Sequence, residues 1–177
     1  MATPIGLRKA APGEYGRLIM LLSEPVSSSG STRTEGIMSE ADNVQRVKDA
    51  FAAFMVGDIP SVLAQLDPSI DWQGVIGTEG VLPQSGRRHG MTAVQEFFRL
   101  VDETVEFASF EPKEYVAQGD TVVAMGHYTG LVKHNGHTFG SPWVMAFTFR
   151  NGRVVRFREF ADSAQLVRAF SAAAVEV

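Results

Sequence analysis

The second half of this sequence constrains the fold most, because four runs rich in Val, Phe, Tyr and Thr alternate with short turn signals. Residues of these types favour β-strands. The turn signals are Gly119-Asp120, Asn135-Gly136 and Asn151-Gly152. Asn-Gly strongly indicates a hairpin, because the tight primed turn needs positive φ at both central residues. Four strands joined by three such turns predict an antiparallel meander, with strands near residues 106–117, 121–132, 138–150 and 153–160.

Two helices are predicted ahead of this meander. Ser39, with Asp42 three residues later, has the pattern of a capping box. The apolar residues within 44–55 then fall on one helical face. Asp58 is placed to cap a second, short helix, which Asp67-Pro68 ends.

The rest of the chain completes an α+β pattern. A short strand is expected near 70–73 and a long Gly-rich loop over 74–90. Thr92 and Gln95 repeat the capping-box pattern before a third helix, and Asp162 is placed to cap a last one. The order predicts an α+β fold in which a curved antiparallel sheet packs on helices. Such a sheet forms a cone, and the mouth of the cone is a natural ligand site.

Residues 1–37 differ from the rest of the chain. They show no sustained apolar period, and they carry three prolines and a polar run over 27–32. Such a stretch buries too little apolar surface to offset the entropy of ordering it. We therefore expect a disordered or loosely packed extension over 1–37, one that is dispensable for stability, and a pocket domain over 38–177. An upstream start codon is an alternative explanation, because the domain pattern begins directly after Met38.

Composition narrows the possible partners and chemistry. The formal net charge is −4, which argues against nucleic acid or an anionic membrane as the main partner. The chain has no cysteine, so disulfides and thiolate chemistry are excluded. No apolar run approaches the about 20 residues of a membrane span, and the apolar cluster at 18–22 is too short for a secretory signal. We expect a cytoplasmic protein. Apolar residues on both faces of the long strands predict a homodimer through the outer face of the meander.

Several landmarks in order carry a family resemblance. They lie at 54–58, at 66–72, at Gly90 with Phe97-Phe98, and at 152–162. With this spacing, residues 40–170 resemble the SnoaL-like branch of the nuclear transport factor 2-like superfamily, which also holds ketosteroid isomerases and limonene epoxide hydrolases. The resemblance implies a cystatin-like α+β cone with a deep pocket, often dimeric. It does not imply one reaction, because the superfamily hosts enzymes of several classes and non-enzymatic binders.

The resemblance to ketosteroid isomerase does not extend to its site residues. The general base of that enzyme corresponds to Trp72, with Asp71 one residue away and therefore on the opposite face of the strand. The oxyanion-hole tyrosine corresponds to Ala50, and the protonated acid to Val144. Steroid isomerisation by that mechanism is therefore disfavoured.

Two other members of the superfamily point to Glu159. In limonene epoxide hydrolase the last-strand carboxylate matches Glu159, but the expected arginine and aspartate are absent from 124–128, where His127 is the ionisable residue. SnoaL-type cyclases use a histidine with an aspartate, for which His127 with Glu159 or Asp162 could serve. Glu159 also alternates in phase with Val155 and Phe157, which directs it to the apolar inner face.

Each candidate has a structural alternative. Glu159 at the end of a strand can instead pair with an arginine or reach water. A structurally satisfied core histidine is the more common role for a residue such as His127, and a helix cap the more common role for Asp162. The expected catalytic residues are Glu159, His127 and Asp162, and the expected pocket-lining residues are Trp72, Phe98, Met125 and Trp143, for which core packing is the alternative.

Three functions remain open on this sequence. The first is an enzyme of the lyase, isomerase, hydrolase or cyclase type that needs no cofactor, acts on an apolar molecule and uses Glu159 as acid or base. The second is a non-catalytic small-molecule binding protein. The third is an assembly module that pairs through its sheet. No metal site is expected, because His89, His134 and His137 lie in loops or turns. A cavity that touches Glu159 would favour the first two functions, and a filled interior would favour the third.

Overall fold

The computed structural model describes residues 38–174, so the extension expected over 1–37 lies outside the described residues. The helices are α1 (Glu40–Met55), α2 (Ile59–Leu63), α3 (Met91–Thr104) and α4 (Ser163–Ser171). The strands are β1 (Leu66–Gln73), β2 (Arg87–His89), β3 (Val105–Gln118), β4 (Thr121–Val132), β5 (Thr138–Arg150) and β6 (Arg153–Ala161).

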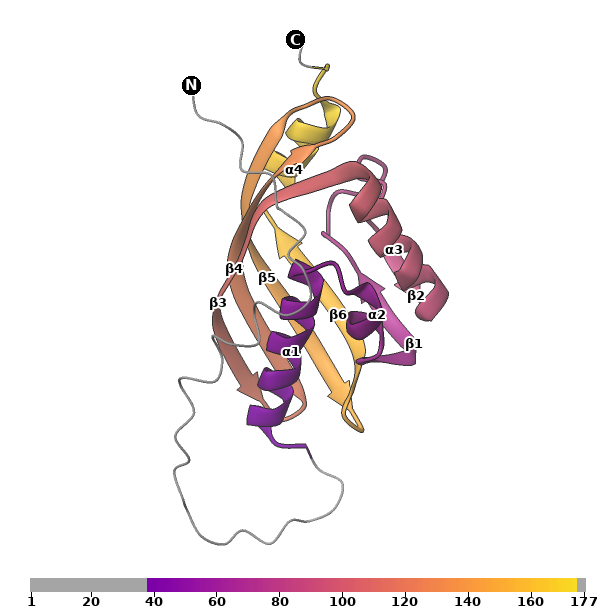
Figure 1. The fold of residues 1–177 in the computed structure, drawn as a ribbon, viewed down its shortest axis with the longest axis vertical. Helices are drawn as coiled ribbons and strands as arrows, with labels where there is room; N and C mark the ends of the chain where they lie inside the picture. The colour runs from indigo at the N-terminus through magenta and orange to yellow at the C-terminus, as the bar shows by residue number, and fades with distance from the viewer. Residues whose placement is uncertain (1–37, 175–177) are drawn as a thin grey trace, which may run out of the picture. The chain divides into compact units, whose positions relative to one another are not determined.

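The described residues form one sheet of six strands in the order β2-β1-β6-β5-β4-β3. β3 to β6 are the predicted antiparallel meander, and β1 pairs with β6 in parallel. The sheet is strongly curved, and α1 and α3 lie over its concave face while α4 lies at one end (Figure 1). The α+β cone expected from the sequence is therefore confirmed.

Helix caps follow the sequence with one exception. Ser39 accepts from Asp42 N at 3.1 Å while the Asp42 carboxylate accepts from Ser39 N at 3.1 Å, so the predicted capping box is present. Asp58 caps α2. The box predicted at Thr92 and Gln95 is wrong, because α3 already begins at Met91 after Gly90, which has no side chain to cap with.

The three turns of the meander differ in tightness. Asn151 and Gly152 both have positive φ, 50° and 72°, as a tight primed turn requires. At the second turn only Gly136 has positive φ, and five residues separate β4 from β5. Asn135 instead donates from Nδ2 to the carbonyl oxygens of Ala169 and Ala172, at 2.8 and 3.1 Å. This asparagine therefore ties the hairpin to the C-terminal end of α4.

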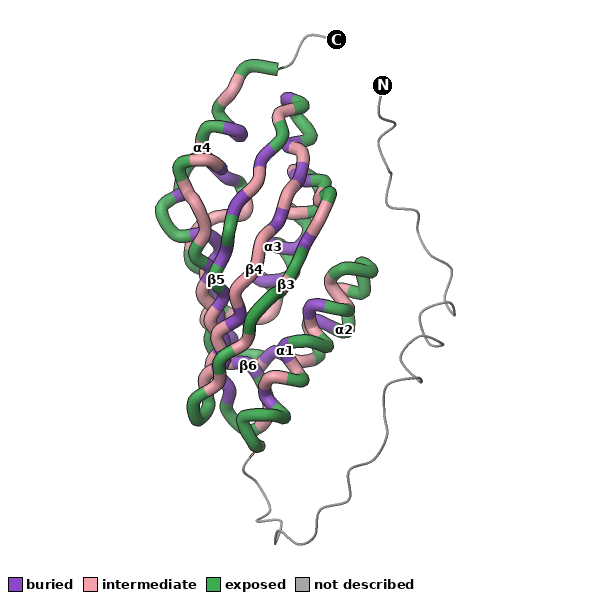
Figure 2. Tube along the Cα trace, turned by 90° about the vertical axis from the view of Figure 1, so that its left-hand side faces the viewer, coloured by how far each residue is buried: buried purple, intermediate pink, exposed green. Residues whose placement is uncertain are grey.

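Side chains alternate between the two faces of the meander. Along β4 and β5 buried positions alternate with half-buried or exposed ones (Figure 2). The buried set faces α1 and α3 and forms the core. No helix within residues 38–174 is long and apolar enough to cross a membrane.

Candidate functional site

The concave face encloses a cavity of about 120 Å³, measured as the space open to the centre of a water-sized molecule. One water needs about 10–15 Å³ on this measure, so the cavity has room for a small organic molecule. Its walls come from α1, α3, the inner face of the sheet and the loop before β2, and they are mostly apolar. The interior is therefore not filled by its own side chains.

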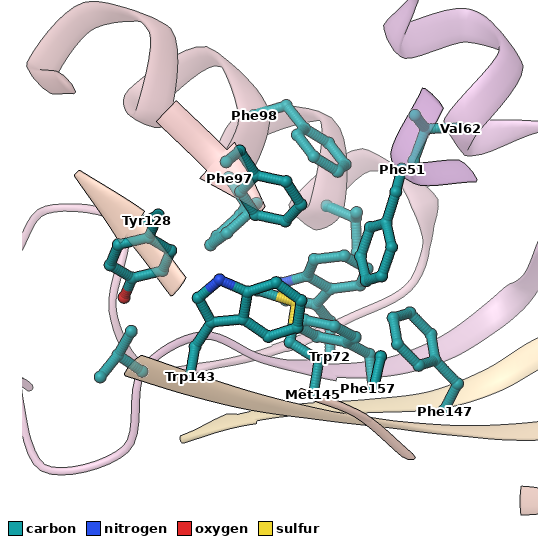
Figure 3. Close-up of a cluster of buried hydrophobic side chains, with 14 of the residues drawn as sticks. Phe51, Val62, Trp72, Phe97, Phe98, Tyr128, Trp143, Met145, Phe147 and Phe157 are labelled. Atoms are coloured by element: carbon teal, nitrogen blue, oxygen red, sulfur yellow. The ribbon is translucent and has the colours of Figure 1, made fainter. Parts of the chain in front are cut away.

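Aromatic rings shape this cavity (Figure 3). Trp72 stacks on Phe157 with ring centroids 3.9 Å apart, and it meets Phe98 edge to face at 5.5 Å. Trp72 and Phe98 both line the cavity, as expected from the sequence. Large rings that pack against each other have few free rotamers, so these walls are stiff.

Glu159 is the only carboxylate among the described residues that line the cavity. It lies on β6, opposite Met145 of β5, and it is 7% exposed. Tyr128 on β4 donates from its hydroxyl to Glu159 Oε1 at 3.3 Å. No Lys, Arg or His of the described chain forms an ion pair with Glu159 within 4.0 Å.

Burial dominates the electrostatics of this pair. Burial raises the pKa of Glu159 to about 7, and the hydrogen bond from Tyr128 opposes that rise because it stabilises the ionised form. Burial also raises the pKa of Tyr128, and the neighbouring carboxylate of Glu159 raises it further. Tyr128 therefore stays protonated near neutral pH, while Glu159 populates both of its forms.

A strand irregularity sets which residues of β6 face the cavity. The register between β5 and β6 shifts between Thr148 and Phe149. As a result Val154, rather than the expected Val155, lines the cavity together with Phe157 and Glu159. The expected inward direction of Glu159 nevertheless holds, because Phe157 and Glu159 both lie beyond the irregularity.

His127 and Met125 differ from the sequence expectation. Both alternate out of phase with the buried Tyr128 and Ala124 on β4, so they lie on the outer face of the sheet. Neither lines the cavity. His127 and Glu159 therefore lie on opposite faces of the sheet and do not meet.

Trp143 and Asp162 also lie outside the cavity wall. Trp143 is buried over Gly126, where a Cβ would collide with its ring, so it is a core residue beneath the lining. Asp162 accepts from Gln165 N at 3.0 Å and caps α4, which is the structural alternative considered for it. Residues 38–174 contain no group of three His, Asp or Glu side chains that could hold a metal ion.

Asp71 lies on the outer face, away from the cavity. Arg87 Nε and Nη2 donate to its carboxylate at 2.8 and 3.0 Å, and Arg158 Nη2 donates at 2.5 Å. The hydrogen bond from Arg87 is the main reason that the pKa of Asp71 is lowered to about 2. Asp71 is thus a structural anion that joins β1, β2 and β6, and it cannot replace the base of a ketosteroid isomerase.

Comparison with known proteins agrees with this architecture. Residues 47–157 match the SnoaL-like domain model. The chain belongs to this SnoaL-like domain family. The search of curated proteins found no match.

Solved structures place this SnoaL-like chain among nuclear transport factor 2-like folds. A protein of this fold from Burkholderia xenovorans is 40% identical, with a TM-score of 0.68 over 76% of this chain and 99% of that one. A second, of unknown function, from Burkholderia pseudomallei is 30% identical, with a TM-score of 0.67 over 76% and 100%. A candidate polyketide cyclase from Pseudomonas putida is 20% identical, with a TM-score of 0.59 over 73% and 98%, and shows the fold alone.

The sequence reasoning missed Tyr128 as the partner of Glu159. The signal was present, because Tyr128 alternates in phase with Ala124 and Gly126, and small residues on an inner face leave room for a large neighbour. Tyr128 on β4 meets Glu159 on β6 because of how both strands are aligned with β5, which lies between them. No local sequence pattern specifies this alignment.

Proposed function

We propose that this SnoaL-like protein is a cofactor-independent enzyme of the isomerase, lyase, hydrolase or cyclase type, with Glu159 as its general acid and base and a small apolar molecule as its substrate. One observation carries the proposal. A single buried carboxylate, with a pKa raised to about 7, lines an otherwise mostly apolar cavity. A catalytic acid or base is most efficient when its pKa lies near the operating pH.

In such a site one residue can both take up the proton and return it. In its ionised form Glu159 takes a proton from an acidic C–H or O–H of the substrate, and the resulting carboxylic acid returns that proton to another substrate atom. Tyr128 stays protonated and donates to the ionised carboxylate at 3.3 Å, which holds the side chain in place. The apolar walls exclude water, so the proton is not lost to solvent.

A carbonyl-bearing substrate would suit these walls. Trp72 lines the cavity, and its Nε1 is buried without a hydrogen-bond partner among the described residues. An unpaired buried donor is costly. A movement of the Trp72 ring that exposes Nε1 to the cavity would let a substrate oxygen satisfy it. Solved structures named as an isomerase and as polyketide cyclases share this fold at 19–21% identity. This similarity supports the fold and does not specify the reaction.

A non-catalytic binding protein is the second candidate. The observation in its favour is that no second carboxylate and no histidine join Glu159 in the described cavity wall. The assembly-module hypothesis loses the observation that would have favoured it over the other two, because the interior is not filled by its own side chains.

Proton exchange separates enzyme from binder without knowledge of the natural substrate. The α-protons of 1-indanone, a small apolar ketone, can be followed by NMR during exchange into D2O. We expect the protein to accelerate exchange, with a rate that rises as pH passes about 7, because the base must be ionised. Glu159→Gln should lower the rate by about 100-fold or more. The matched control is Glu106→Gln on the exposed part of β3.

Binding of 1-indanone without exchange would support the binding protein instead. Equal acceleration by the Glu159→Gln variant would contradict the role of Glu159.

A further inference from the structure

The cavity carries a second charged residue, at the end away from Glu159. Arg46 of α1 is the only cation among the described residues that line the cavity. Gly152 lies in the β5–β6 turn, and a Cβ atom added to it would lie 3.7 Å from Arg46 Nη2. The guanidinium therefore lies at the turn end of the cavity, beside the N-terminal half of α1.

The two charges lie far apart along the sheet. Glu159 lies seven positions after Gly152 along the chain, and at about 3.3 Å per residue of strand this is on the order of 20 Å. In Figure 1 the β5–β6 turn lies beside the start of α1, and the other end of β6 lies toward α4. The cavity thus has an acidic pole and a basic pole with aromatic walls between them.

Arg46 has no counter-ion in the described chain. No carboxylate of residues 38–174 forms an ion pair with its guanidinium within 4.0 Å, and its side chain makes no hydrogen bond there. Gln65 lines the same end and packs against this turn of α1. With its amide oriented so that both groups are satisfied, Gln65 donates to the carbonyl oxygen of Arg46 and accepts from the N–H of Ala50. Five guanidinium donors are thus open to an external acceptor.

We infer that the ligand of this cavity is an elongated apolar carboxylic acid, whose carboxylate binds Arg46 while its apolar body lies between the aromatic walls. This inference rests on the proposed function and names its substrate class. An arginine fork binds a carboxylate through two parallel hydrogen bonds. The acid group cannot bind at the other pole, because ionised Glu159 would repel it. The opposite orientation is therefore disfavoured, and the reacting part of the ligand lies toward Glu159.

Two probes of equal length test the inference. Octanoate and its neutral isostere octanamide are titrated by calorimetry at pH 8. The wild type should bind octanoate about tenfold more tightly than octanamide. Arg46→Gln should remove that preference and leave octanamide binding unchanged, while Arg46→Lys should keep part of it. Lys48→Gln is the matched control, because Lys48 is exposed on the same helix, does not line the cavity and lies over the Tyr115 ring.

The outcomes separate this inference from the proposed function. Equal affinity of the wild type for both probes, or an unchanged preference in Arg46→Gln, would overturn the carboxylate assignment and leave the apolar pocket standing. Failure of both probes to bind the wild type would overturn the pocket proposal as well. A preference that weakens between 50 mM and 500 mM NaCl would support an ionic contact at a partly exposed arginine.

Discussion

Replacing Glu159 by glutamine removes a buried charge while keeping the shape of the side chain. The carboxyl group has an ordinary pKa of 4.5 and a pKa of about 7 in the folded protein. Between these values folding takes up a proton, so the free energy of unfolding falls as pH rises. The destabilisation is absent below about pH 4.5 and complete above about pH 7. A difference of one unit between two pKa values corresponds to about 1.4 kcal/mol, so the free energy of unfolding falls by about 3 kcal/mol in total.

Urea denaturation of the wild type and Glu159→Gln across this pH range measures the effect. We expect the variant to gain about 3 kcal/mol relative to the wild type between about pH 4.5 and pH 8. Any cost of burying the glutamine amide is independent of pH, so it shifts the unfolding free energy of the variant by the same amount at every pH. Glu106→Gln, at an exposed position on β3, should show no such gain. A difference that does not change with pH, or one in which the wild type gains with rising pH, would refute the burial argument.

Two further predictions follow from the same structure. Tyr128→Phe should raise the pKa of Glu159 further, because the variant loses the hydrogen bond that favours the ionised form; NMR titration of the Glu159 carboxyl carbon measures this, and a lower pKa would contradict the assignment. We also propose a homodimer through the outer face of the sheet, where Phe160 and Val144 are 48% and 36% exposed. Sedimentation at micromolar concentration should show about twice the 19.2 kDa chain mass, and Phe160→Glu should give a monomer; a monomeric wild type would contradict the proposal.

Local sequence signals predicted the fold correctly where a residue type strongly favours one local conformation. Asn151-Gly152 specifies its turn because both residues must adopt positive φ, and both do. Ser39 and Asp58 mark helix starts because their side chains replace missing backbone acceptors. The same signal at Asn135-Gly136 correctly predicted a hairpin between β4 and β5, but not a tight primed turn, because the Asn135 side chain bonds to α4, a segment distant in sequence. Helix α3 begins at Met91, directly after Gly90, and has no side-chain cap. The capping-box pattern at Thr92 and Gln95 was therefore not sufficient to locate its start.

The candidate site was predictable only as far as strand phase was predictable. Glu159 was predicted to face inward because it alternates in phase with Val155 and Phe157. Phe157 and Glu159 line the cavity, whereas Val155 does not. His127 is one residue from Tyr128, and that single step moves a side chain through the sheet to its outer face. His127 and Glu159 therefore cannot form a pair, because their side chains lie on opposite faces of the sheet. Tyr128 replaces His127 as the group that contacts Glu159, and Tyr128 has no charge to neutralise the carboxylate. For this reason burial controls the titration of Glu159, and its pKa of about 7 supports the proposed role of this single carboxylate as acid and base.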